Sequence, residues 1–408
     1  MCSSDLTVVW DRTTGEPLGP GLGWQDLRTV FTCLELQARG LRFAPNQSAT
    51  KYGWSLDTFD AERGRDLCLG TVDSWIAWAL SGGDLHVTDA SNAAVTGLAA
   101  PGATDWADLP LEALRIAPAS LPRIVDSCGP IGPTTALEGA PPIVALVGDQ
   151  QASLLGQGCV RPGLAKITFG TGGMLDACTG ATAPDSEARS AHGTFPIIGW
   201  RHAGATTWGV EAIMLSAGTA VQWLVDDLGI LDSAAASDAL AASVPDAGGV
   251  AFVPALLGLG TPEWDFGARG ALLGITRGTG RAHITRAVLE GVAQRGADLV
   301  EAAEQDAGLS LPALRIDGGM SANATFVQAL ADATRRPVEV SPVLEATTLG
   351  AGLLGHVATG AFASIDDLAD TWRPRTVVEP GTPLDRDRWR EAVRRASGWE
   401  SGLSSLSF

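Results

Sequence analysis

The stretch that decides the fold is Val147-Gly148-Asp149-Gln150-Gln151. Residues 143–147 read as a buried β-strand that ends at Gly148, and residues 168–173 form a glycine-rich run that follows a short predicted helix. Such a strand delivers the carboxylate of Asp149 to the edge of a cleft. A glycine-rich hairpin suits a phosphate, because glycine lets backbone N–H groups approach it closely. The combination favours phosphoryl transfer.

Composition limits the proteins to which such a site can belong. With 408 residues and 45% hydrophobic content, the chain can bury large cores and is expected to form two domains. A net charge of -18 argues against nucleic acid or an anionic membrane as partner, since both need clustered Lys and Arg. We therefore expect a small-molecule partner. Only Lys51 and Lys166 are lysines, and we attribute this to GC-rich coding DNA.

The six cysteines show no C-x-x-C spacing, so we expect reduced and mostly buried thiols. The five histidines are scattered and predict no zinc site. No apolar run of about 18 residues and no signal-peptide pattern is present, which favours a cytoplasmic protein without a membrane span.

Strand-like apolar runs alternate with helix-like segments along the whole chain, which predicts an α/β architecture. We expect helices over residues 27–37, 73–80, 283–307 and 386–396, the second and third stopped by glycines at 82 and 308. A strand is expected over residues 314–316.

Four segments carry a recognisable combination. They are VGDQQASLLGQ (147–157), AKITFGTGGML (165–175), GALLGITRGTGRAHITRAVLE (270–290) and RIDGGMSAN (315–323). Their order and spacing closely resemble the FGGY carbohydrate kinases, and within that family the glycerol kinases. The resemblance implies two actin/hexokinase-like (ribonuclease H-type) domains that close over a cleft where ATP and a polyol meet. Residues 7–156 would be what remains of the N-terminal, substrate-side domain, and residues 157–408 the C-terminal, ATP-side domain.

By this resemblance, Asp149 is the catalytic base. A carboxylate beside the attacking hydroxyl orients it and accepts its proton late in a loose transition state. The alternative is a helix N-cap, a common role for Asp after a strand. Gln150 matches a contact to a substrate hydroxyl, and the alternative there is a plain surface Gln.

The resemblance also implies an ATP site built from three turns. The hairpin at Gly170 and Thr171 would bind phosphate, and its alternative is an ordinary turn. Gly218 and Gln222 match nucleotide contacts at the start of a helix, and their alternative is simple helix packing. Gly319 and Asn323 match the adenosine-side loop, and their alternative is a strand-to-helix turn. No G-x-x-x-x-G-K-[ST] segment is present, which excludes a Walker-type site. The implied ATP-binding residues are Gly170, Thr171, Gly218, Gln222, Gly319 and Asn323.

The substrate pocket departs from the glycerol kinases at two positions. Asn46 stands where they have a tyrosine, and Met174 where they have an aromatic, while Trp24 retains their tryptophan. A flexible thioether and an amide replace two aromatics, so the pocket is expected to be roomier and more polar. Glycerol remains the first expectation. A tetritol or pentulose kinase stays open, as does an inactive actin-like ATP-binding protein, although a pure binder needs no base at Asp149.

Two family segments are absent from the sequence: the D-x-G-T-[ST] turn for phosphate and Mg²⁺, and the N-Q-R-E segment for substrate hydroxyls. Residues 1–6 match nothing in the family and read like a translated sequencing adapter. We therefore expect an N-terminally truncated fragment that expresses poorly and has little activity. ATP and Mg²⁺ are the implied cofactors, no metal-binding residue is assigned, and a homo-oligomer is possible.

Overall fold

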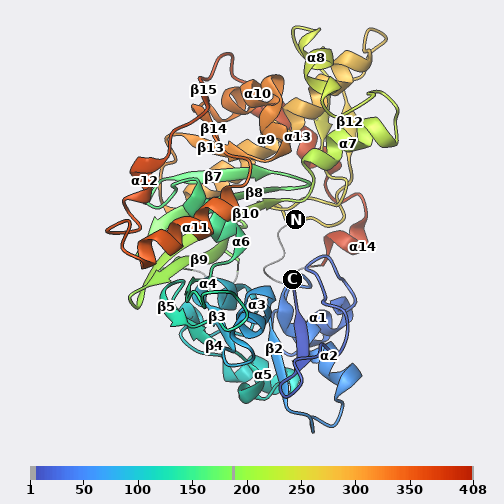
Figure 1. The fold of residues 1–408 in the computed structure, drawn as a ribbon. Helices are drawn as coiled ribbons and strands as arrows, with labels where there is room; N and C mark the ends of the chain where they lie inside the picture. The colour runs from blue at the N-terminus through green and yellow to red at the C-terminus, as the bar shows by residue number, and fades with distance from the viewer. Residues whose placement is uncertain (1–5, 186–188, 407–408) are drawn as a thin grey trace.

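The computed structural model describes residues 6–185 and 189–406. Figure 1 shows the elements up to β4 gathered at one end of the molecule and a large sheet flanked by helices at the other. Of the predicted non-native segment, residues 1–5 lie outside the described residues. Among those described, no helix is both long and apolar enough to cross a bilayer.

The N-terminal part contains two small sheets. Strands β1 and β2 pair antiparallel, and β3 and β4 pair parallel. A core around Tyr52, Leu56 and Leu69 fills the space between the helices. The elements are β1 (Val8–Asp11), α1 (Val30–Gln37), α2 (Ser48–Phe59), β2 (Leu67–Gly70), α3 (Val72–Ser81), β3 (Val87–Asp89), α4 (Ala90–Val95), η1 (Pro101–Ala103), α5 (Asp108–Leu114), η2 (Pro118–Ser120) and β4 (Arg123–Val125).

The rest of the chain is organised by a nine-stranded mixed sheet. Its strands, in order across the sheet, are β15 (Thr376–Val378), β14 (Val338–Val340), β13 (Leu314–Asp317), β7 (Ala165–Phe169), β8 (Gly173–Gly180), β10 (Ala205–Met214), β9 (Phe195–His202), β5 (Cys128–Gly132) and β6 (Ile143–Ala145). Two of these strands, β5 and β6, come from before residue 157. Membership of the sheet therefore does not follow the predicted division at residues 156 and 157.

Helices cover both faces of this sheet (Figure 1). Two helices, α9 (Arg281–Ala307) and α10 (Ala324–Thr334), pack on one face through a continuous apolar cluster. The opposite face carries α6 (Asp149–Gly156) and α11 (Ala346–Ala358). The remaining elements are α7 (Gly218–Asp226), α8 (Ala236–Ala242), β11 (Ala251–Val253), β12 (Ala271–Leu273), η3 (Gly319–Ala322), α12 (Leu368–Thr371), α13 (Arg386–Ala396) and α14 (Ser401–Ser404).

The strongest local signals in the sequence are confirmed. Helix α3 ends at Gly82 and α9 at Gly308, each glycine in the left-handed region that a helix C-terminus favours. Helix α13 has the predicted bounds, and β13 extends the predicted strand by one residue. Helix α1 begins three residues later than expected, at Val30.

One expected strand differs in character. The segment at residues 143–147 is not a buried strand: β6 covers only Ile143–Ala145, and all three residues are half-buried. The reason is its place at the end of the sheet, where a strand has a neighbour on one side only. The thiol prediction is confirmed where the structure describes it, since Cys33, Cys68, Cys128, Cys159 and Cys178 are free and buried.

Candidate active site

Asp149 is the first residue of α6. Gly148 occupies the N-cap position, so Asp149 is not the cap itself. One oxygen of its half-buried carboxylate accepts the Gln150 backbone N–H at 2.6 Å. The positive end of a helix dipole favours a carboxylate at this position. The arrangement can hold a proton acceptor beside an incoming hydroxyl.

A buried polar chain holds the loop ahead of α6. The Gly148 N–H donates to Ser91 Oγ at 2.9 Å, and Ser91 Oγ donates to Asp89 Oδ2 at 2.8 Å. Ser127 Oγ donates to the same carboxylate oxygen at 2.5 Å. Burial, with the nearby Asp73 carboxylate adding to it, raises the pKa of Asp89 to about 6. The residue before Asp149 is thus tied to β3 and α4 of the N-terminal part.

The predicted glycine hairpin is present between β7 and β8, with Phe169 paired to Gly173. Its turn packs against the start of α7: the Gly218 N–H donates to the Gly170 carbonyl, and the Ala217 N–H to the Thr171 carbonyl, both at 2.9 Å. A Cβ on Gly218 would lie 2.5 Å from the Gly170 oxygen. The structure therefore brings Gly170, Thr171 and Gly218 together, with both turn residues exposed.

The turn after β13 lies against the same hairpin. Gly318 has φ +85°, and a Cβ there would lie 2.4 Å from the Phe169 carbonyl oxygen, so the close approach requires glycine. Gly319 beside it is exposed, with no atom within 4 Å of a Cβ built on it. Open space at Gly170 and Gly319 flanks the hairpin, and this fits a ligand held by backbone groups.

Two predicted nucleotide contacts have their side chains engaged by the protein. Asn323 Oδ1 accepts the Phe326 N–H at 2.9 Å, which caps α10, and Nδ2 donates to Ser237 Oγ at 2.9 Å. Gln222 Nε2 donates to Asp226 on the same exposed helix face at 2.7 Å. The strand-to-helix turn anticipated as the alternative for Asn323 is therefore present. The helix packing anticipated for Gln222 is not, because its side chain is exposed.

Three predicted substrate contacts lie on different elements. Trp24, ahead of α1, is 38% exposed. Asn46 is exposed between α1 and α2, and its carbonyl accepts a hydrogen bond from Lys51 Nζ at 3.0 Å. Met174 is half-buried on β8, and side-chain alternation puts it on the same face of the sheet as Asp176.

A row of charged residues crosses the sheet face that carries α6, and sequence reasoning did not find it. Strand register aligns the row across five neighbouring strands. Lys166 and Asp176, at its centre, are fully buried and form an ion pair at 2.7 Å. One signal was available in the sequence, since Lys166 is one of only two lysines in the chain. The structure shows that both are fully buried. The charged row is Glu211, Asp176, Lys166, Arg315 and Glu339.

Asp317 lies on this face too, paired in register with Thr168. Its Oδ2 accepts a long hydrogen bond from Ser153 Oγ of α6 at 3.5 Å, while its buried Oδ1 has no hydrogen-bond partner in the described part of the chain. Within that same part, no group of three or more His, Cys, Asp or Glu side chains is arranged to hold a metal ion.

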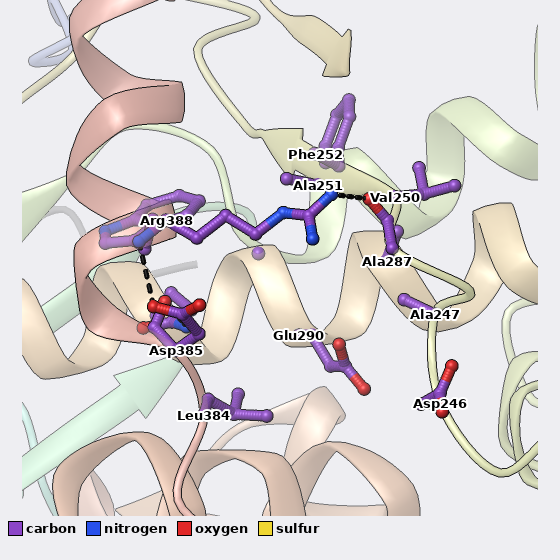
Figure 2. Close-up of a pocket in the computed structure, with 14 residues that line it drawn as sticks. Asp246, Ala247, Val250, Ala251, Phe252, Ala287, Glu290, Leu384, Asp385 and Arg388 are labelled. Carbon is purple, nitrogen blue, oxygen red and sulfur yellow. Dashed lines mark hydrogen bonds between the residues drawn. The ribbon is translucent and has the colours of Figure 1, made fainter. Parts of the chain in front are cut away.

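A separate cavity of about 290 Å³ lies between α9, α13 and the loop before β11 (Figure 2). Arg388 extends across it to the Gly249 carbonyl, and Asp385 accepts the Arg388 backbone N–H at 2.9 Å. None of the predicted site residues lines this cavity. The predicted catalytic and phosphate-binding residues lie elsewhere, at the α6 N-terminus and at the two glycine turns.

Comparison with known proteins identifies the family. The FGGY family of carbohydrate kinases matches twice: its N-terminal domain over residues 3–156 and its C-terminal domain over residues 165–359. A glycerol kinase of Aromatoleum aromaticum is 45% identical over 97% of this chain and 83% of its own length. A glycerol kinase of Halorhodospira halophila is 43% identical over 97% and 82%.

Solved structures share the fold. A Plasmodium falciparum glycerol kinase, solved with ADP, has a TM-score of 0.86 at 27% identity, covering 100% of this chain and 83% of that one. A xylulose kinase from Rhodospirillum rubrum has a TM-score of 0.80 at 24% identity, covering 97% and 82%. The chain belongs to the FGGY family of carbohydrate kinases.

Proposed function

We propose that the protein transfers the γ-phosphoryl group of ATP to glycerol, forming sn-glycerol 3-phosphate, with Asp149 as general base. The observation that carries the proposal is the Asp149 carboxylate at the start of α6. Helix α6 covers one face of the sheet, and the glycine hairpin joins strands β7 and β8 of that sheet. The identity to glycerol kinases of other organisms supports the choice of acceptor. We extend the proposal to a substrate-side domain over residues 7–156 and an ATP-side domain over residues 157–408.

Transfer requires little covalent chemistry from the protein, so positioning and charge stabilisation supply the rate. Asp149 accepts the proton of the attacking hydroxyl, and Gln150 contacts a neighbouring oxygen of the acceptor. Trp24, Asn46 and Met174 form the pocket wall. The nucleotide binds along the backbone of Gly170, Thr171, Gly218 and Gly319. Its edge contacts Gln222 and Asn323.

Mg²⁺ enters with ATP as part of the substrate. Mg²⁺ is usually bound through one or two carboxylates together with substrate phosphates, which does not require a cage of three protein ligands. The Asp149 carboxylate is a donor of this type, and so is Asp317 Oδ1, which has no hydrogen-bond partner among residues 6–185 and 189–406. When bound, the ion neutralises charge on the phosphates. A cytoplasmic location belongs to the same proposal because ATP is the donor, and assembly into a homo-oligomer remains a prediction.

A kinase for a longer polyol or a pentulose is the second candidate, because Asn46 and Met174 replace two aromatics of the glycerol kinases. Purified protein with ATP and Mg²⁺ is assayed for ADP release with glycerol, erythritol and xylulose. The proposal predicts the highest kcat/KM for glycerol. Turnover of xylulose or erythritol alone would favour the second candidate. ATP binding without turnover of any of the three would favour an actin-like binding protein.

A further inference from the structure

The Lys166 ammonium is in contact with three oxygen atoms of neighbouring side chains. Its Nζ contacts Asp176 Oδ2 at 2.7 Å, Gln150 Oε1 at 2.7 Å and Thr168 Oγ1 at 3.0 Å. Nζ donates hydrogen bonds to the Gln150 and Thr168 oxygens, and its contact with Asp176 is an ion pair. Because Lys166 is also fully buried, it acts on a ligand only through one of these partners.

The charge on Lys166 is maintained by its surroundings. Burial alone lowers the pKa of a lysine, but the Asp176 carboxylate, with Asp317 and Glu211 adding to it, raises the pKa of Lys166 above its ordinary value. Asp176 lies directly opposite Lys166 across the β7–β8 hairpin, so the pair is fixed by strand register. Lys166 is therefore a permanent donor held on a rigid element.

This donor determines which end of the Gln150 amide faces the protein. Lysine accepts no hydrogen bond, so the Gln150 oxygen must be the atom that faces it. The Gln150 amide nitrogen is thereby turned away from Lys166. Gln150 is half-buried and directly follows Asp149 at the start of α6.

We propose that Lys166, held by Asp176, is a positioning residue that fixes Gln150 with its amide nitrogen toward the acceptor. This inference rests on the proposed function. Gln150 then donates to an oxygen of the acceptor, while Asp149 accepts the proton of the attacking hydroxyl. Gln150 and Asp149 thus present a hydrogen-bond donor and a hydrogen-bond acceptor to one polyol. The polyol must therefore carry an oxygen that faces Gln150.

The test removes both charges of the pair. Lys166→Met alone leaves Asp176 buried without a partner and is expected to destabilise the fold. The double variant Lys166→Met/Asp176→Leu removes the uncompensated charge at similar volume, so we expect its thermal midpoint to stay near that of the wild type. A matched control, Arg390→Met/Asp387→Leu, removes an exposed ion pair of α13.

In the buried double variant we expect KM for glycerol to rise about tenfold, the loss of one well-placed hydrogen bond, with kcat within about threefold. Gln150→Ala should raise KM similarly in the wild type and add nothing in the double variant, because both changes remove the same contact. The control should leave KM unchanged.

Three results separate the possible failures. A folded double variant with wild-type KM, or full additivity with Gln150→Ala, would overturn the positioning role and leave Lys166 structural. Absence of turnover and of glycerol binding in the wild type would instead refute the proposed function. A double variant that does not fold would contradict the expectation that the pair can be replaced by apolar side chains.

Discussion

The two faces of the nine-stranded sheet differ in chemistry. On the α9 face, strand residues such as Ile167, Leu175 and Ile316 pack into one apolar cluster with α9 and α10. On the α6 face, the neighbouring positions of the same strands carry Lys166, Asp176 and Asp317. Alternation along each strand sends successive side chains to opposite faces, so one sheet supplies stability on one side and polar chemistry on the other.

If this division holds, apolar truncation on the α9 face should cost stability and leave substrate recognition intact. Phe326 of α10 is fully buried and stacks edge-on against Phe169 with ring centroids 4.8 Å apart. Phe326→Ala should lower the free energy of unfolding by about 3–5 kcal/mol. Urea unfolding measures this change, and KM for glycerol, determined well below the unfolding temperature, should not change. A selective rise in KM at unchanged stability would break the comparison.

The buried polar chain through Asp89, which holds the loop ahead of α6, should make the stability of the protein depend on pH. The folded pKa of Asp89, about 6, lies above its unfolded value near 3.9, so the native state binds the extra proton. The stability that this group contributes is complete below about pH 3.9 and is lost as pH rises through about 6. The loss is about 2–3 kcal/mol.

Asp89→Asn removes this ionisation. On going from pH 4 to pH 7, the unfolding free energy of the wild type should therefore fall further than that of the variant, and the extra loss should equal this amount. Asp387→Asn, at a side chain that is 97% exposed, is the matched control and should not alter the pH dependence. Identical pH profiles for the wild type and Asp89→Asn would show that the pKa of Asp89 does not differ between the folded and unfolded states.

The α6–α11 contact should couple stability to activity. A Cβ on Gly350 would lie 1.8 Å from the Ala152 carbonyl oxygen, and one on Gly156 would lie 2.0 Å from that of Ala346. Both obstacles are backbone atoms, so Gly350→Ala must move α11 away from the helix that carries Asp149. We expect a loss of about 1–3 kcal/mol in thermal or urea unfolding, together with a lower kcat.

Gly352, on the same helix, supplies the control, because nothing lies within 4 Å of a Cβ built there. Gly352→Ala should be neutral or stabilise by about 0.5–1 kcal/mol, since alanine is the better helix residue. Equal effects at both positions would mean that helix propensity, rather than the close crossing, decides the outcome.

Sequence alone predicted the elements with strong local signals. Glycine stops define the ends of α3 and α9, and the glycine run forms the hairpin between β7 and β8. The family resemblance assigned Gly170 and Gly218 to one nucleotide site, but their direct contact is known only from the structure.

The charged row was beyond such reasoning for a physical reason. It exists only through the register of strands between residues 166 and 339, which no local pattern encodes. Lys166 and Asp176 are ten residues apart but face each other across the hairpin, so their pairing depended on knowing its register. The edge position of β6 likewise depends on strand order. The roles of Asn323 and Gln222 within the fold required side-chain contacts.

The most direct test of the account is the paired measurement of kcat and thermal midpoint for Asp149→Asn, with Asp387→Asn as control. We expect kcat to fall about 10²–10⁴-fold in Asp149→Asn, because the proton acceptor is lost, while stability changes by no more than about 1 kcal/mol. Asp387→Asn should alter neither quantity. A variant Asp149→Asn that folds normally and retains kcat within a few-fold of the wild type would contradict the assignment of phosphoryl-transfer chemistry to the α6 face.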